Sequence, residues 1–292
     1  MRVALPLALA ASAALPLALA VSAVVGLATV AVAAEAVEHL TVPAPGGATI
    51  DVLAQGIGPL VVLLPSRGRA AEDFDPIAGP IAAAGYRVLR PEPRGIGGST
   101  GPTAGLTLHD LGGDVEAVIE AAHDGRAVVV GHAFGNFVAR TVASDRPDLV
   151  RGVVIAAAAG KHYPDALAAA VTASSDTSRS DAERLPDLRR TLFAPGHDPA
   201  VWLGGWYPAV DADQRAATLR TKQSDWWGAG RAPLLEIQAA DDPFKTPDQR
   251  GELKAEFGDR VTVALVPDAS HALVPEQPRA VAEAIVAWMK TH

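Results

Sequence analysis

Two carboxylates and a histidine directly follow apolar, β-branched runs in the C-terminal part of the chain. Asp241 and Asp242 come after the run 234–237, and His271 comes after the run 261–266. Imidazole changes charge near neutral pH, so it can take up and release protons when a carboxylate orients it. These residue types therefore offer general acid–base chemistry. Because a lone histidine is more often structural, the assignment depends on the elements around it.

A turn bounded by two glycines lies earlier in the chain. The stretch Gly131-His132-Ala133-Phe134-Gly135 stands between an apolar run and a helical pattern. The glycines permit a turn tight enough to push its central residue out above a sheet. That residue is an alanine, whose methyl group can neither attack a carbon atom nor move a proton.

Apolar, β-branched runs alternate with amphipathic stretches along most of the chain. Such alternation predicts a mostly parallel sheet with helices on both faces, an α/β architecture. A hairpin, 37–42 and 48–53, is expected ahead of it through Pro45-Gly46-Gly47. The expected strands are 60–64, 86–89, 127–130, 152–156, 234–237 and 261–266. The expected helices are 74–84, 108–122, 136–144, 248–257 and 278–289.

The segment 161–231 interrupts this alternation, because it has helical patterns but no convincing strand. Its place between two strands predicts a helical cap over the end of a core made of 35–160 and 232–292. Large aromatic side chains are concentrated in it, and they either line a pocket beneath the cap or pack in the cap's own core. They are Trp202, Trp206, Tyr207, Trp226 and Trp227.

Taken together, residues 38–290 resemble the α/β-hydrolase superfamily in its capped form. The glycine-flanked turn resembles the nucleophile elbow G-x-S-x-G, with Ala133 in place of the serine. The loop at Asp242 resembles the one that carries the family's acid, with Asp241 as the fallback. The loop at His271 resembles the one that carries the catalytic histidine. Elbow, acid and histidine follow one another in the order that the family requires.

The resemblance also implies the other groups of a catalytic site. His271 and Asp242 are expected to form a catalytic pair beside Ala133. The loop at Ser66 falls where hydrolases place an oxyanion-hole amide, so the backbone amides of Arg67 and Phe134 are the expected donors. The side chains expected to contact a substrate are those of Ser66, His132, Trp202, Trp206 and Trp226.

Several further side chains leave two interpretations open. Ser66 and Ser270 could replace the missing nucleophile, although a loop hydroxyl more often bonds its local backbone. The His132 ring is a weaker candidate, because residues at this elbow position generally pack beneath the turn. Lys161 and His162 either reach the mouth of the pocket or are simply solvated.

Ala133 excludes an acyl-enzyme at the elbow, because no oxygen is present to attack a carbonyl. His271 could still deprotonate a water or the substrate while the two amides stabilise an oxyanion. The sequence therefore favours an enzyme, a hydrolase or lyase, that acts on a small apolar or aromatic molecule without a covalent intermediate. Two alternatives stay open: a silent binding protein for a small hydrophobic ligand, and an inactivated Ser-to-Ala variant of a serine esterase. Epoxide hydrolases and dehalogenases of the superfamily would need an aspartate at the elbow.

The composition excludes several other classes. The net charge is −8 and no basic stripe is present, so nucleic acid is not an expected partner. The chain has no cysteine, which excludes thiol nucleophiles and cysteine-ligated metals. The glycine-rich stretch 94–99 is no dinucleotide fingerprint, because Thr100 occupies the third glycine position. No Walker-type loop and no histidine-rich metal spacing are present, so no cofactor or metal is expected.

The N-terminus has a different composition from the rest. After Arg2, residues 3–34 are apolar, small or proline. A basic start, an apolar stretch and the small residues near Ala31-Val32-Ala33 predict a signal peptide over 1–34 and export. The run is also long enough to act as an uncleaved membrane anchor over 3–34, in which case it is the expected membrane contact.

Overall fold

The computed structural model describes Met1 and residues 36–292. The predicted signal peptide, or anchor, lies outside the described residues, and export remains a prediction. An eight-stranded sheet runs through the described part in the order β1-β2-β4-β3-β5-β6-β7-β8. Its strands are β1 (Glu38–Ala44), β2 (Ala48–Gln55), β3 (Leu60–Leu64), β4 (Arg87–Pro91), β5 (Ala127–His132), β6 (Val150–Ala156), β7 (Leu234–Ala239) and β8 (Val261–Val266).

Helices follow most of the strands. The α-helices are α1 (Asp75–Ala83), α2 (Leu108–Ala122), α3 (Gly135–Asp145), α4 (Asp165–Ser175), α5 (Asp181–Thr191), α6 (Pro208–Arg220), α7 (Gln223–Trp226), α8 (Glu252–Phe257), α9 (Leu273–Glu276) and α10 (Pro278–Met289). Short 3₁₀ helices are η1 (Pro45–Gly47), η2 (Ala71–Phe74), η3 (Pro199–Trp202), η4 (Pro247–Gln249) and η5 (Gly258–Arg260).

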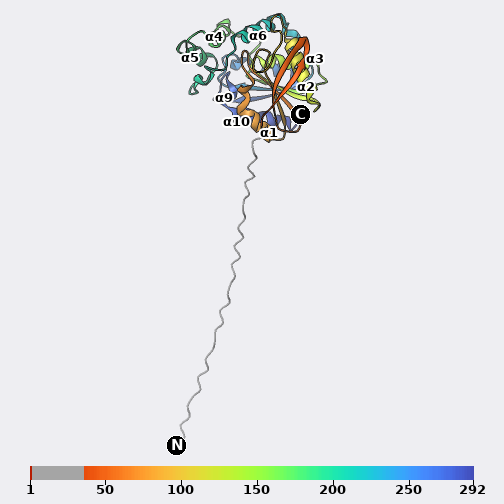
Figure 1. Ribbon diagram of the computed structural model, residues 1–292. Coiled ribbons are helices and arrows are strands. Elements are labelled where there is room, and N and C mark those ends of the chain that lie inside the picture. The colour runs from red at the N-terminus through yellow and green to blue at the C-terminus, as the bar shows by residue number, and fades with distance from the viewer. Residues whose placement is uncertain (2–35) are drawn as a thin grey trace. The chain divides into compact units, whose positions relative to one another are not determined.

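Each face of the sheet supports its own hydrophobic core. Successive side chains of a strand point to opposite faces. Accordingly, Val62 of β3 packs in the core that contains α2 and α3, whereas Val61 and Leu63 pack in the core that contains α1 and α10. In Figure 1, α1 and α10 lie beside each other, and α2 and α3 lie on the other side of the sheet. The predicted three-layer α/β architecture is confirmed.

The direction of the strands decides where a site can form. β1 and β2 form the predicted antiparallel hairpin, and β2 pairs antiparallel with β4. From β4 to β8 all neighbouring strands are parallel. The loops that leave the carboxyl ends of β3, β5, β7 and β8 therefore meet at one edge of the sheet, where α/β proteins place their ligands.

Two sequence-based predictions differ from the structure. The helix predicted over 248–257 is broken into η4 and α8, because the Gln249 side chain turns back to the Thr246 amide and the chain passes through Gly251 before a helix resumes. The apolar run 261–266 is typical of a buried strand, but β8 pairs only with β7 at the edge of the sheet. As a result, Val263 and Leu265 are 42% and 51% exposed.

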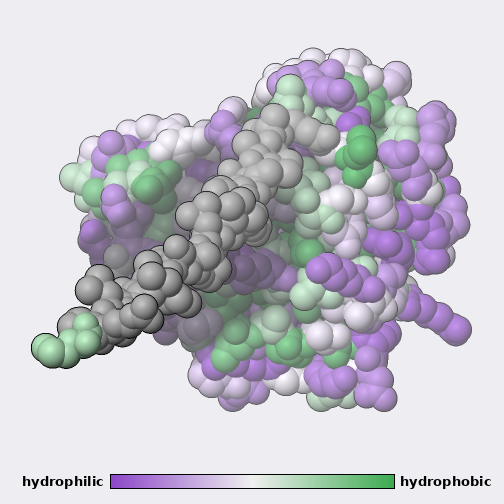
Figure 2. Space-filling model, turned by 90° about the horizontal axis from the view of Figure 1, so that it is seen from below, coloured by the Kyte–Doolittle hydropathy of each residue, from purple (hydrophilic) through white to green (hydrophobic). Residues whose placement is uncertain are grey.

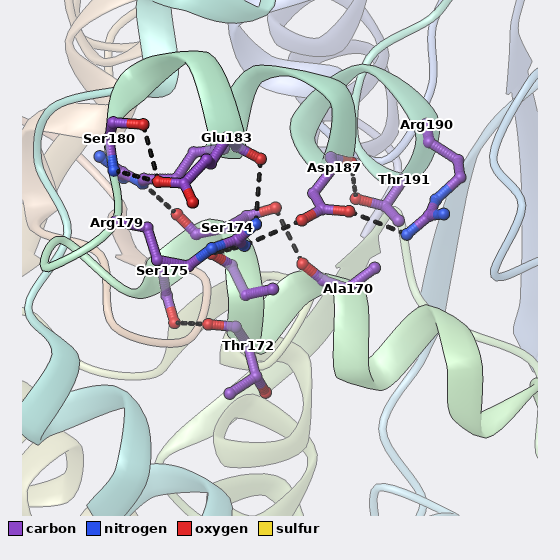
Figure 3. A network of polar contacts seen from close by, with 12 residues as sticks. Ala170, Thr172, Ser174, Ser175, Arg179, Ser180, Glu183, Asp187, Arg190 and Thr191 are labelled. Atoms are coloured by element: carbon purple, nitrogen blue, oxygen red, sulfur yellow. Dashed lines mark hydrogen bonds and ion pairs between the residues drawn. The ribbon is translucent and has the colours of Figure 1, made fainter.

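The chain between β6 and β7 contains α4 to α7 and no strand, and the structure describes this segment throughout. Figure 3 shows how α4 and α5 are joined by polar contacts. Ser180 and Glu183 form a capping box at the start of α5, and the buried Arg184 donates from Nε to the Ser174 carbonyl at 2.8 Å. Arg179 reaches Asp187 at 3.0 Å. These contacts hold the two helices together as a scaffold.

Hydrophilic and hydrophobic residues are interspersed on the face presented in Figure 2. The large exposed apolar side chains of the described residues are distributed over several elements; among them are Ile57, Val201, Leu219 and Val263. Within residues 36–292, no helix combines the length and the apolar character that crossing a membrane requires.

Glu92, directly after β4, is a buried acid. Its Oε2 accepts a hydrogen bond from the Ala71 amide at 2.9 Å. Burial raises the pKa of Glu92 to about 6, and repulsion by Glu72 and Asp51 adds to this rise. Because the folded-state pKa lies above the ordinary value of 4.5, stability falls as the pH rises from about 4.5 to about 6.

We expect Glu92→Gln to stabilise the fold at pH 8 by up to about 2 kcal/mol, since glutamine keeps the acceptor oxygen but needs no buried charge. The gain should disappear near pH 4, where the wild-type carboxyl is protonated in both the folded and the unfolded state. Urea unfolding at the two pH values measures the difference. An unchanged or lower stability of the variant at pH 8 contradicts the assignment.

Candidate active site

The chain makes a sharp turn between β5 and α3. Ala133 has φ 48°, a left-handed conformation that costs a non-glycine residue about 1–2 kcal/mol. The flanking glycines are required, because a Cβ on Gly131 would lie 2.3 Å from the Asn136 amide nitrogen, and one on Gly135 would lie 2.2 Å from the Leu64 carbonyl oxygen. The turn thus has the geometry of a nucleophile elbow although it carries an alanine.

Surrounding hydrogen bonds support this strained conformation. The Ala133 amide donates to the Ala156 carbonyl at 3.0 Å, and its own carbonyl accepts from the Asn136 amide at 3.1 Å. The Asn136 side chain also donates to that carbonyl. Strained residues of this kind persist where the neighbouring structure holds them, and they concentrate at functional sites.

The loops after β7 and β8 bring a carboxylate to a histidine. His271 Nδ1 donates to Asp242 Oδ2 at 2.9 Å, and both side chains are buried. The other carboxylate oxygen of Asp242 accepts from the Phe244 amide at 2.8 Å. Asp241, the fallback acid, is exposed, and the contacts of its backbone run to Ala269 and Ser270. The structure therefore pairs Asp242, and not Asp241, with His271.

His132 lies beneath the elbow and holds the histidine loop. Its side chain is buried, and Nε2 donates to the His271 carbonyl at 2.7 Å. Burial, together with the neighbouring His271, lowers the pKa of His132 to about 3. The ring is therefore neutral at physiological pH and is committed to a structural bond. It is not among the cavity-lining residues, so it differs in this respect from the expected substrate contact.

Two backbone amides are free where the family resemblance places an oxyanion hole. Within the described part of the chain, neither the Arg67 nor the Phe134 amide donates a hydrogen bond to a protein acceptor. Both residues line the same cavity as Ala133 and His271. Two free amides that open on one cavity are suited to stabilise a developing negative charge.

The cavity between the elbow and the helices α4 and α6 has a volume of about 370 Å³. Its apolar wall includes Phe134 and Phe137 from the elbow region, Val171 from α4 and Phe244 from the acid loop. The base, the elbow and the free amides thus open into one space of a size that fits a small molecule.

A family model described as "Alpha/beta hydrolase family" matches residues 61–284. The chain belongs to this family. The match includes the turn at Ala133 and the loops that carry Asp242 and His271.

Two of the matched relatives are named as hydrolases. A 2-(acetamidomethylene)succinate hydrolase from Mesorhizobium japonicum is 28% identical over 169 residues, which are 58% of this chain and 56% of that protein. An epoxide hydrolase from Caballeronia sordidicola is 34% identical over 113 residues, which are 38% of this chain and 34% of that protein. The alignments therefore span about half, or less, of the length of these relatives.

A solved structure agrees over a longer range. An esterase from Thermogutta terrifontis superposes with a TM-score of 0.70 at 20% identity, covering 87% of this chain and 98% of that one. At this identity the agreement shows the shared fold alone.

Three tryptophans expected to contact a substrate pack elsewhere in this alpha/beta hydrolase. Trp202 and Trp206 enclose the Arg69 guanidinium, whose carbon lies 4.6 and 4.8 Å from their ring centres. Trp226 packs in the core that contains α2 and α3, where it contacts Phe137 with ring centres 4.5 Å apart. None of the three lines the cavity. These rings fill interior space, two of them around a buried cation.

Other residues that line the cavity were indicated only weakly by sequence motifs, or not at all. Phe137 lies four residues after Ala133, and Phe244 lies two residues after Asp242, so proximity to the motifs could have indicated both. Lys161 and His162 do line the cavity. Arg215, in the middle of α6, also lines it, and no motif pointed to this residue.

The two serine candidates have different surroundings. The Ser270 hydroxyl donates to the Asp241 carbonyl at 3.1 Å and does not line the cavity. Ser66 lines the cavity, and its hydroxyl makes no hydrogen bond to any described residue. Among residues 36–292, no cluster of three or more histidine and carboxylate side chains is arranged to hold a metal ion.

Proposed function

We propose that this protein is a hydrolase in which His271, oriented by Asp242, acts as a general base and no acyl-enzyme forms. The observation that carries the proposal is the 2.9 Å contact between His271 Nδ1 and Asp242 Oδ2 in a site whose elbow residue is Ala133. A protein that only binds a ligand has no need of such a pair. The two relatives named as hydrolases support the same class of reaction.

The reaction follows from the protonation states that these contacts favour. Asp242 accepts from Nδ1, which leaves Nε2 of the neutral His271 as the proton acceptor. A water beside Ala133 gives its proton to Nε2 while its oxygen bonds to the electrophilic carbon of the substrate. The oxyanion that forms is stabilised by the Arg67 and Phe134 amides. When the bond to the leaving group breaks, the imidazolium returns the proton to that group.

The walls of the cavity support a small substrate with an apolar part. Phe134, Phe137, Val171 and Phe244 offer a continuous set of apolar contacts beside the base. Burial of such surface stabilises binding by about 25 cal/mol per Å². We therefore propose a compact molecule whose apolar portion faces these side chains and whose scissile bond lies near Ala133.

The test is turnover by the folded wild-type protein of a panel of small carboxylic esters, amides and enol-type substrates, followed by product analysis. Intact-mass spectrometry during turnover should show no covalent adduct, and His271→Ala should remove the activity. A covalent adduct, or unchanged turnover by His271→Ala, contradicts the mechanism. Tight binding of a panel member without any turnover would favour a binding protein instead.

A further inference from the structure

The cavity is lined by cationic side chains as well as by its apolar wall. Arg67, Lys161 and Arg215 line it, against the single carboxylate Asp165. Lys161 is neutralised by Glu256, with Nζ and Oε2 2.8 Å apart. The two arginines are different, and their arrangement indicates a subsite.

Arg67 is held in place by the cap. Its Nε donates to Asp211 on α6 at 2.8 Å, and one terminal nitrogen, Nη2, donates to Thr172 on α4 at 3.3 Å. The other terminal nitrogen, Nη1, makes no hydrogen bond to any residue that the structure describes, and the side chain remains 16% exposed. A fixed guanidinium that lines a cavity with a free donor is pre-organised to bind an anion.

Arg215 lies on the same side of α6 as the partner of Arg67. It follows Asp211 by four residues, which places the two side chains one turn apart on one face of the helix. Burial raises the pKa of Asp211, and the charges of both Arg67 and Arg215 oppose this rise. Arg67 contacts this carboxylate, and the charge of Arg215 acts on it from one helical turn away. Arg215 makes no ion pair with the described residues, so a surplus of one positive charge remains at this point.

Asp165 does not cancel this surplus. It lies in the first turn of α4, seven residues before Thr172, and is exposed. At 1.5 Å per residue, it is displaced by about 10 Å along the helix from the residue that Arg67 contacts. Solvent weakens the interaction of such an exposed carboxylate with nearby cations.

We propose that Arg67 and Arg215 form a subsite for a carboxylate group of the substrate. One surplus positive charge matches one carboxylate, and the free Nη1 of Arg67 supplies a directed hydrogen bond. The substrate thus carries an apolar part, a carboxylate toward α6 and a scissile bond near Ala133. This inference rests on the proposed function for the identity of the ligand as substrate, but the subsite itself is tested by binding alone.

The experiment compares phenylacetate, phenylpropionate and phenylbutyrate with their uncharged primary amides, by calorimetry and by ligand-observed NMR. Wild-type protein should bind at least one acid about tenfold more tightly than its amide, and high salt should reduce the difference. Arg215→Gln should reduce the preference to about twofold without loss of folding, because this side chain is exposed. Arg67→Lys keeps the charge near Asp211 but loses the forked guanidinium donor, and it should also weaken binding of the acid.

Arg220→Gln is the matched control, since Arg220 is an exposed arginine of the same helix that does not line the cavity. It should keep the wild-type preference. Equal affinity for acids and amides, no binding of any acid, or an unchanged preference in Arg215→Gln overturns the subsite. Selective acid binding without turnover would remove the proposed hydrolysis and keep the subsite. Turnover that depends on His271 but shows no preference for acids would keep the proposed hydrolysis and remove the subsite.

Discussion

Ala133→Ser is expected to convert this protein into an esterase that works through an acyl-enzyme. The backbone at residue 133 already has the left-handed conformation of an elbow, with φ 48°. His271, Arg67 and Phe134 line the same cavity, so a new hydroxyl meets a base and two oxyanion donors. We expect hydrolysis of p-nitrophenyl acetate to rise by about 10³-fold over the wild type, because a positioned nucleophile with its base adds at least this much to what donors alone supply.

A stopped-flow trace should show an initial release of p-nitrophenol close to one equivalent of enzyme. Mass spectrometry should then show one acetyl group on the peptide that contains residue 133. The double variant Ala133→Ser, His271→Ala is the control and should lose both signals. If the folded serine variant shows neither an initial release nor an adduct, the base and the donors are not assembled as we describe.

Loss of the acid should have an effect of at least similar size. Asn at position 242 keeps the size of the side chain and an oxygen for the Phe244 amide, but its amide group favours the wrong tautomer of His271. In the Ala133→Ser background, where ester hydrolysis is easily measured, we expect Asp242→Asn to lower kcat by about 10³–10⁴-fold. His271→Ala should lower it by at least about 10²–10⁴-fold, the contribution of a positioned base.

Asp241→Asn provides a matched comparison, because the neighbouring acid is exposed and its side chain does not reach the histidine. It should keep kcat within about twofold of the parent. Circular dichroism and thermal unfolding must show that the Asp242→Asn protein is folded before its rate is interpreted. Equal losses of kcat in the two aspartate variants would contradict the assignment of Asp242 as the acid that orients His271.

Much of the fold was predictable from local pattern. Apolar, β-branched runs alternate with amphipathic stretches, and burial of a strand or of one helix face imposes these periods directly on the sequence. The elbow was also recognisable, because only glycine tolerates the close backbone contacts at Gly131 and Gly135. The position of Asp242 and His271 after parallel strands indicated that both lie at one sheet edge, and their contact is a consequence of that topology.

Only the tertiary structure decided which side chains face the cavity. A tryptophan is equally apolar in a pocket wall and in a core, so sequence could not tell that Trp202 and Trp206 enclose Arg69. β8 lies at the edge of the sheet because it pairs with β7 alone. The number of strands that pair with a given strand is not encoded in its local sequence pattern. Similarly, Arg215 is one charged residue on a solvated helix until the fold places it one turn from the Asp211 that holds Arg67. Contacts between residues distant in the chain follow from packing, which local periodicity does not specify.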